Sequence, residues 1–458
     1  MKHILRALPL LAMLTLGGQA QDTHWVASWA TAPAAYFVYV PPVPPTATPP
    51  QAYAPATIQP DLGFPFPEAN GHAAANQTIR SIVKPDLWGN RMRFRLSNAF
   101  GTGPVTFNAV SVGLQEYGGN QVKGTATPVM FGGRRQVTVA PGQEVWSDAT
   151  SLTWVKGADD PSVQGRNLAV SYFLSANSGP MTYHAASNQT SYISAPGSGD
   201  HTADADVFAY EFTTTSWFFL DGVDVMAPMN TVVVCAFGDS ITDGTHTTLN
   251  QNDRWADALS RRLHNAYGNR ISVVNEGIGG NRVVNPAVAN ATSGPAATDR
   301  LERDVLGLSG LGHVIWLEGI NDLGASHTPD AIMAGYKDVV GRLHAKGVKV
   351  YGATLTSALG MENVPEGWNP GVLKVTGDNG AEVDAGRKTL NNFIRTGGLF
   401  DGVEDFDGAT LDPATGNMKA EFVPNSQMTQ LPWDYLHPNH AGYMAMAQAV
   451  DIAPFRPR

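Results

Sequence analysis

The chain has 458 residues, of which 43% are hydrophobic and 15% are charged, and its formal net charge is −10. A typical globular protein is roughly 25% charged, so this chain is poor in charge, yet it is far too apolar to be generally disordered. The acidic excess argues against affinity for nucleic acids or anionic membranes, since both need a basic face. A single cysteine excludes an internal disulfide framework and a cysteine-rich zinc site.

The first twenty residues have the pattern of a secretory signal. A basic start is followed by the apolar run Ile4–Leu16 and by small residues up to Ala20. The alternative is a membrane anchor, but this run is short for a span of about 20 residues. We expect cleavage after Ala20 and a secreted or periplasmic protein with no transmembrane segment.

Residues 21–74 are predicted to form an N-terminal segment with a proline-rich loop. Eight of the residues in 41–60 are proline, a composition that favours extended geometry and prevents helix or central strand. A spacer is the simplest interpretation, and a site for a proline-reading partner is the alternative.

Residues 75–228 have the pattern of short strands. Apolar residues and arginines alternate over 91–97, which is typical of a half-buried strand. Further short runs are separated by Gly, Pro, Asn and Asp, which predicts an antiparallel β-sandwich-like accessory domain. Trp217, Phe218 and Phe219 could form a carbohydrate platform on it, although at least one of these three consecutive aromatic residues should be buried.

From residue 229 onward the pattern changes to alternating strands and helices. Continuous apolar strands are predicted at 231–237, 271–274, 313–317 and 348–353, with amphipathic helices at 255–266 and 332–343 between them. Such alternation predicts an open parallel α/β sheet, whose functional residues lie just beyond the carboxyl ends of the strands.

Three of these strands are followed by residues that suit nucleophilic catalysis. Ser240 follows the first, the glycine-rich stretch around Gly280 follows the second, and Asn321 follows the third. A serine there can expose its hydroxyl, while a glycine N–H and an amide side chain can stabilise an oxyanion. The alternatives are a helix-capping serine, an ordinary glycine turn and an Asx turn.

Near the C-terminus, Asp434 and His437 lie three residues apart in a loop that contains Pro438. This histidine could take the proton of the serine, and the aspartate could fix its tautomer. The alternative is a surface loop with a structural histidine. A metal site at His437 and His440 is disfavoured because no further ligand cluster is evident.

Four sequence blocks in this order resemble the SGNH hydrolases, also called the GDSL family, over roughly residues 231–450. They are Gly-Asp-Ser-Ile at 238–241, Gly-Gly-Asn at 279–281, Gly-Ile-Asn-Asp at 319–322 and Asp-Tyr-Leu-His-Pro at 434–438. The resemblance implies a flavodoxin-like α/β/α hydrolase domain, placed at 229–458. It also implies hydrolysis of carboxylic esters through an acyl-enzyme, with no metal or organic cofactor.

The same resemblance assigns roles to individual residues. Ser240 corresponds to the nucleophile, His437 to the general base and Asp434 to the partner of that base. The backbone N–H groups of Ser240 and Gly280 and the side chain of Asn321 correspond to the oxyanion hole.

The front of the chain resembles secreted bacterial members of the family that have a β-rich domain before the hydrolase domain. The segments 25–33 and 93–101 carry this likeness. We expect Trp25 to Ala32 to pack back onto the hydrolase domain. Asp239 and Asp243 either order the nucleophile loop or face solvent, and His246 and His327 are expected at the surface.

The sequence therefore predicts an exported serine esterase that acts on acetyl or short acyl esters. A polysaccharide O-acetyl esterase or a lipase of the same fold is the first alternative, and acyl transfer to a sugar is another. A non-catalytic carbohydrate-binding protein is the alternative from a different functional class.

Overall fold

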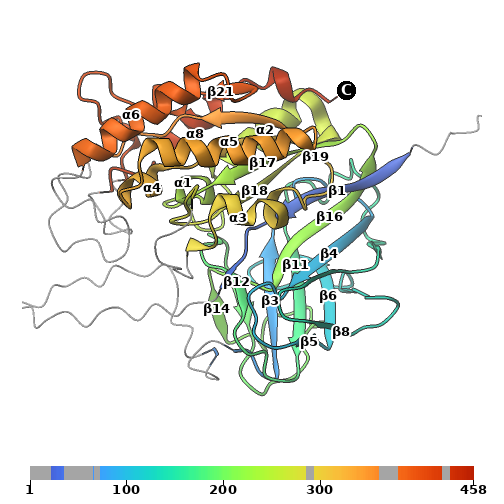
Figure 1. Ribbon diagram of the computed structural model, residues 1–458. Helices are drawn as coiled ribbons and strands as arrows, with labels where there is room; N and C mark the ends of the chain where they lie inside the picture. The colour runs from blue at the N-terminus through green and yellow to red at the C-terminus, as the bar shows by residue number, and fades with distance from the viewer. Residues whose placement is uncertain are drawn as a thin grey trace, which may run out of the picture.

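The computed structural model describes residues 22–35, 65–66, 73–284, 293–359, 380–424 and 434–457. The predicted signal segment, 1–20, and the proline-rich stretch, 41–60, lie outside the described residues. Figure 1 shows a β-rich lower half and an upper half in which helices pack around a parallel sheet. This is the predicted fold class.

The sheet of the upper half has five parallel strands in the order β18-β17-β19-β20-β21. The strands are β17 (Val232–Gly238), β18 (Ile271–Gly277), β19 (Leu311–Leu317), β20 (Lys349–Ala353) and β21 (Gly402–Glu404). Numbered along the chain, their order is 2-1-3-4-5, which is the flavodoxin-like arrangement. The topological switch point lies beside β17, so the end of that strand is the expected place for a site.

Helices cover both faces of this sheet. On one side α2 packs against α8, and on the other α5 packs against α3 and α6. The helices are α1 (Ser240–Asp243), α2 (Trp255–Tyr267), α3 (Ala297–Arg300), α4 (Ile320–Gly324), α5 (Pro329–Ala345), α6 (Gly380–Thr396), α7 (Phe406–Thr410) and α8 (His440–Ala449). Shorter helical turns span Gly268–Arg270, Leu301–Val305, Ala420–Phe422 and Ala453–Phe455. Two helical layers around one sheet make the α/β/α sandwich.

The β-rich half is antiparallel throughout. One sheet has the order β1-β16-β4-β10, with β9 also on β4, and the other has the order β14-β13-β3-β11-β6-β7. Two smaller sheets, β15-β12-β2 and β5-β8, complete it. The strands are β1 (Thr23–Ala30), β2 (Ala34–Ala35), β3 (Gln77–Val83), β4 (Arg91–Ser97), β5 (Val105–Phe107), β6 (Ala109–Leu114), β7 (Thr127–Pro128), β8 (Val137–Val139), β9 (Glu144–Trp146), β10 (Thr150–Ser151), β11 (Leu168–Leu174), β12 (Thr182–His184), β13 (Ser191–Ile193), β14 (Phe212–Thr214), β15 (Trp217–Phe218) and β16 (Leu220–Pro228).

Strand β1 connects the two halves. It pairs antiparallel with β16 and also packs against β18 of the parallel sheet. The Ala27 N–H donates to the Ser309 carbonyl at 2.9 Å, and the Ser272 hydroxyl donates to the Ala27 carbonyl at 2.7 Å. The expectation that this segment packs back onto the hydrolase domain is therefore confirmed. A single buried hydrophobic cluster runs through both halves.

One expectation for the β-rich half holds only in part and another is wrong, for the same reason. In β4 the alternation is seen at Arg91, which is exposed, and at Arg93, which is half-buried. Arg95, however, is only 4% exposed and forms an ion pair with Asp221 at 2.7 Å. Trp217, Phe218 and Phe219 are all buried, so they cannot form a carbohydrate platform. Sheet faces that would be solvated in an isolated sandwich are covered by neighbouring strands and by the hydrolase domain.

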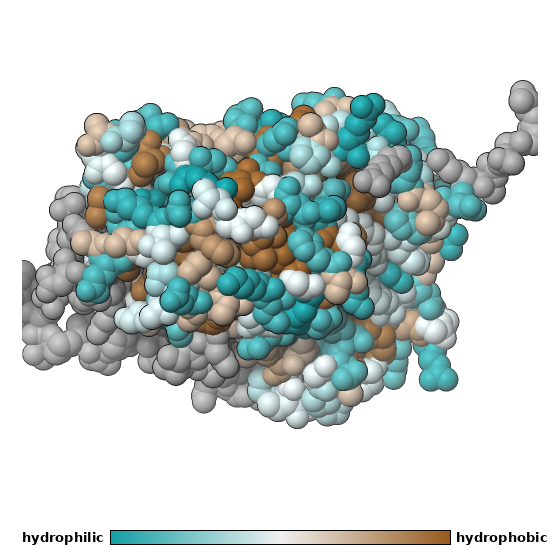
Figure 2. Space-filling model, turned by 45° about the horizontal axis from the view of Figure 1, so that its top comes forward, coloured by the Kyte–Doolittle hydropathy of each residue, from teal (hydrophilic) through white to brown (hydrophobic). Residues whose placement is uncertain are grey.

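The surface of the described residues is mixed in character. On the face in Figure 2, hydrophilic side chains are spread widely and hydrophobic ones gather toward the middle. In the described part of the chain, no helix combines the length and the apolar character needed to cross a membrane.

Arg300, the last residue of α3, lies in the interior behind two strand ends. Its guanidinium donates to the Gly238 carbonyl at 2.9 Å and to the Glu276 carbonyl at 2.8 Å, at the ends of β17 and β18. It also donates to Asn281 Oδ1 at 2.8 Å and lies over the ring of Phe237, 4.3 Å from the ring centroid. Arg300 thus ties together the segments that follow both strands.

We expect Arg300→Met to lower the free energy of unfolding by about 3–5 kcal/mol, because the buried acceptors lose their donor and Asp304 keeps only one of its two arginine partners, Arg303. Urea denaturation followed by tryptophan fluorescence measures this. Arg261→Met, at an exposed arginine of α2, is the matched control and should change it by about 0.5 kcal/mol or less. A loss at Arg300 no larger than at Arg261 would contradict the assignment.

Candidate active site

Ser240 lies where strand β17 turns into the short helix α1. Asp239 caps this helix, and its Oδ1 accepts the Ile241 N–H at 3.0 Å. The cap fixes the turn, so that Ser240 becomes the first helical residue at the carboxyl edge of the sheet. Asp239 is fully buried, and burial followed by the charge of Glu318 raises the pKa of its carboxyl to about 7.

The structure brings Ser240, His437 and Asp434 together. Ser240 Oγ is 2.7 Å from His437 Nε2, and His437 Nδ1 is 2.8 Å from Asp434 Oδ2. The other oxygen of Asp434 accepts the N–H groups of Leu436 and His437, both at 2.9 Å. These backbone bonds hold the carboxylate in line with the imidazole, so Nδ1 carries the proton and Nε2 is free to accept one from the serine.

The surroundings of this pair shift the pKa values of both groups. Burial alone would lower the pKa of His437, but the charge and hydrogen bond of Asp434 outweigh it and raise that pKa above its usual 6.5. Burial would raise the pKa of Asp434, but His437 and a second histidine, His246, hold it well below its usual value. The aspartate therefore stays ionised while the histidine titrates.

Asn321 links the two segments that carry the other predicted oxyanion donors. Asn321, in α4, donates from Nδ2 to the Asn281 carbonyl at 3.0 Å, and Nδ2 is 3.4 Å from Asp239 Oδ2. Asn321 thus contacts the neighbour of Gly280 on one side and the neighbour of Ser240 on the other. Gly280 has φ +75°, which a glycine adopts without strain. Among the described residues, no acceptor lies on the N–H of Ser240 or of Gly280.

Asp322 holds the two loops at this edge against each other. Its carboxylate accepts the Val283 N–H at 2.9 Å and the Val284 N–H at 3.0 Å, just beyond the glycine-rich loop. Burial raises the pKa of its carboxyl to about 7. Asp322 explains why an acid follows Asn321: it anchors the chain that leaves Gly280.

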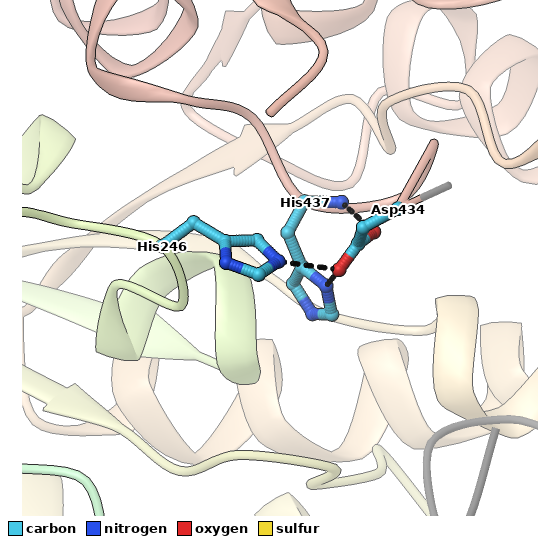
Figure 3. A group of neighbouring side chains, drawn as sticks. All are labelled: His246, Asp434 and His437. Atoms are coloured by element: carbon cyan, nitrogen blue, oxygen red, sulfur yellow. Dashed lines mark hydrogen bonds and ion pairs between the residues drawn. The ribbon is translucent and has the colours of Figure 1, made fainter. Parts of the chain in front are cut away.

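His246 belongs to this group, although the sequence predicted it at the surface. Figure 3 shows His246 and His437 approaching the same carboxylate from two sides. His246 Nε2 is 2.7 Å from Asp434 Oδ2, and only 5% of its side chain is exposed. The surface expectation is wrong. In the sequence, His246 lies six residues after Ser240, just beyond the turn at Gly244, so it could be expected near the serine. No local pattern, however, indicates a contact with Asp434.

The three side chains His246, Asp434 and His437 also form a group of the type that can hold a metal ion. Both imidazoles, however, face Asp434 Oδ2 at hydrogen-bond distance, so protons already satisfy the contacts that a metal would need. His440, the other histidine considered for a metal site, pairs instead with Asp253 at 2.9 Å.

A flavodoxin-like sheet with a hydrogen-bonded serine, histidine and aspartate at its switch point is the arrangement of an SGNH-type hydrolase. A family comparison gives the particular family: residues 236–445 match the GDSL-like Lipase/Acylhydrolase family. Residues 236–445 therefore form a hydrolase domain of the GDSL type. A comparison with curated proteins finds no match.

A comparison with solved structures finds matches that each cover about half of this chain. They include the carbohydrate acetylesterase Est24 from Sinorhizobium meliloti, with 19% identity and a TM-score of 0.34, covering 48% of this chain and 96% of that one. An aryl esterase from M. smegmatis has 18% identity and a TM-score of 0.34, with coverage of 48% and 96%. A GDSL-like lipase from Bacteroides thetaiotaomicron has 14% identity and a TM-score of 0.32, with coverage of 47% and 84%.

We expect the imidazole of His437 to titrate above 6.5, because the ionised Asp434 stabilises its protonated form. Histidine-selective NMR across pH 5–9 measures this midpoint, and a His437→Gln variant assigns the signal. In Asp434→Asn the midpoint should move down, since the stabilising charge is gone. A midpoint that is unaffected by Asp434→Asn would contradict the electrostatic account.

We expect His246→Asn to raise the midpoint of His437 further. The Nε2–H of His246 stabilises the charge on Asp434 Oδ2, so its loss leaves more of that charge for His437. Asparagine suits the site because His246 has φ +66°, a left-handed backbone that asparagine tolerates. His344→Asn, at the exposed pair with Asp401, is the matched control and should leave the midpoint unchanged. No shift in His246→Asn would refute a shared carboxylate.

Proposed function

We propose that this protein is an exported serine esterase that hydrolyses acetyl or short acyl carboxylic esters through an acyl-enzyme. The observation that carries the proposal is the line of hydrogen bonds from Ser240 Oγ through His437 to Asp434, at the switch point of a GDSL-type domain. Export is supported by the basic start and the apolar run of residues 4–16.

In the first half of the reaction, Ser240 Oγ attacks the ester carbonyl carbon while His437 Nε2 takes its proton. The carbonyl oxygen becomes an oxyanion, which accepts hydrogen bonds from the N–H groups of Ser240 and Gly280 and from Asn321 Nδ2. The side-chain amide of Asn321 carries two hydrogens. One is donated to the Asn281 carbonyl at 3.0 Å, while the 3.4 Å distance from Nδ2 to Asp239 Oδ2 is too long for a strong hydrogen bond. The second hydrogen can therefore be donated to the oxyanion.

The tetrahedral intermediate then collapses. The bond to the leaving alcohol breaks, and His437 gives that alcohol its proton, which leaves the acyl group on Ser240. Water attacks the acyl-enzyme with His437 again as base, and the acid and the free serine are released. Asp434 stays ionised throughout and stabilises the imidazolium. Activity requires neutral His437, so it should decline as the pH falls below the raised pKa of that residue.

The preference for short acyl groups is supported by the polar surroundings of the serine. Polar side chains contact Ser240, His437 or Asp434, or the immediate neighbours of these three residues. They are Asp239, Asn281, Asn321 and His246. Such neighbours favour a small acyl group over a long alkyl chain, whose burial needs an apolar wall. Acetyl groups on a polysaccharide satisfy the same requirement and remain the alternative substrate.

The test is turnover of p-nitrophenyl acetate, butyrate and octanoate and release of acetate from acetylated xylan. We expect turnover of the acetate ester and a loss of at least about 10⁴-fold in Ser240→Ala, because the nucleophile is removed. Ser162→Ala, at an exposed serine of the β-rich half, is the matched control and should retain full activity.

Other outcomes separate the alternatives. Turnover that favours octanoate would indicate a lipase, and activity on xylan alone would indicate a polysaccharide acetylesterase. Absence of wild-type turnover on every substrate would favour a carbohydrate-binding protein. Turnover that survives in Ser240→Ala would refute the nucleophile.

A further inference from the structure

One histidine of the β-rich half reaches into the hydrolase domain. His184 ends strand β12, and it is buried, with 4% of its surface exposed. Its Nδ1 lies 2.9 Å from the Ala32 carbonyl, and its Nε2 lies 3.0 Å from Asp243 Oδ1. The ring also packs against Trp217, with 5.6 Å between centroids, so its orientation is fixed on three sides.

These two contacts determine the charge of His184. A carbonyl and a carboxylate oxygen can only accept hydrogen bonds, so both ring nitrogens must donate and the ring is an imidazolium. Burial by itself would lower the pKa of His184, and the nearby guanidinium of Arg254 acts in the same direction. The charge and hydrogen bond of Asp243, together with the Ala32 carbonyl, outweigh them and raise this pKa.

Asp243 connects the imidazolium of His184 to the loop that contains Gly279 and Gly280. While Oδ1 faces His184, Oδ2 accepts the Gly279 N–H at 3.1 Å, and Gly279 immediately precedes Gly280. Asp243 is also the last residue of α1, the helix that begins with Ser240. One buried carboxylate therefore connects the nucleophile helix, the loop with the Gly280 N–H and the β-rich half.

Neighbouring residues of the β-rich half strengthen this contact. Arg254 donates from Nη2 to the Ser187 carbonyl and from Nε to the Asp243 carbonyl, both at 2.6 Å. Asn188 donates to the Gly244 carbonyl at 3.2 Å. The segment after β12 thus holds the end of α1 at several points, and it does so from outside the residues that match the hydrolase family.

We propose that His184 is a positioning residue for the oxyanion hole, acting through Asp243 on the Gly279–Gly280 loop, so that the β-rich half is a working part of the active site. The inference rests on the proposed esterase function. Without His184, the buried Asp243 carboxylate loses the cation that is hydrogen-bonded to Oδ1 and can turn toward water or another donor, which releases the Gly279 N–H. The Gly280 N–H then moves from the place where the oxyanion forms.

The experiment compares the full-length wild type with His184→Ala and His184→Gln. Glutamine can still donate one hydrogen bond to Asp243 but carries no charge. We expect kcat on p-nitrophenyl acetate to fall roughly 10- to 100-fold in His184→Ala, with KM changed less than about threefold. His184→Gln should recover part of the loss. His201→Ala is the matched control, since His201 forms a similar pair with Asp204 in the β-rich half, at 2.8 Å, and should leave kcat within about twofold.

A second readout separates positioning from general destabilisation. Sulfur accepts hydrogen bonds poorly, so an intact oxyanion hole favours the oxygen ester over the matching thiono ester, in which sulfur replaces the carbonyl oxygen. We expect the oxygen-to-thiono ratio of kcat/KM to fall in both His184 variants and to stay at the wild-type value in His201→Ala. A structural role alone would lower the amount of active enzyme and leave this ratio unchanged.

The outcomes distinguish this inference from the function on which it rests. Wild-type turnover that is lost in Ser240→Ala, with an unchanged ratio in His184→Gln, would overturn the inference and leave the esterase intact. If His184→Ala shows no cooperative thermal unfolding, the ratio in His184→Gln decides. Absence of wild-type turnover would refute the esterase itself.

Discussion

The site depends on one buried guanidinium, that of Arg300. Parallel strands expose carbonyl groups at their carboxyl ends, and these groups need donors when the edge is covered by other elements. Arg300 supplies them to Gly238 and Glu276, and its third bond goes to Asn281. A planar group with fixed donor directions sets the spacing between the chain that leads to Ser240 and the chain that carries Gly280. Their relative position is thereby built into the core.

Around this constraint the site is unusually rich in buried acids. Burial raises the pKa values of Asp239 and Asp322 to about 7, and it raises that of Glu318 as well. Each of the two aspartates still accepts backbone N–H bonds that order a loop. Asp434 differs, because two histidines face it and keep it ionised. Asp239 and Asp322 are therefore loop anchors, whereas Asp434 is the charged partner of His437.

Much of the fold and the site could be predicted because the signals were local. The strands around β17 and the helix at Pro329–Ala345 follow from periodicity and end signals that act within a few residues. Ser240, Gly280 and Asn321 each follow a parallel strand, and such strands end at one edge of a sheet. That geometry gathers the three residues in space without any knowledge of their contacts. At Arg95 and Trp217 the local pattern predicted exposed side chains. Other elements of the structure cover both residues, so this prediction failed.

By itself the sequence determined the class of the hydrolase domain, its alternation of strands and helices, and which residues follow the carboxyl ends of its strands. Only the tertiary structure decided which distant groups complete that edge. His246 meets Asp434 across 188 positions, Arg300 meets Gly238 across 62, and His184 meets Asp243 across 59. Periodicity and turn chemistry act over a few residues, whereas these pairings depend on how separate elements pack and on which buried charge each element must neutralise.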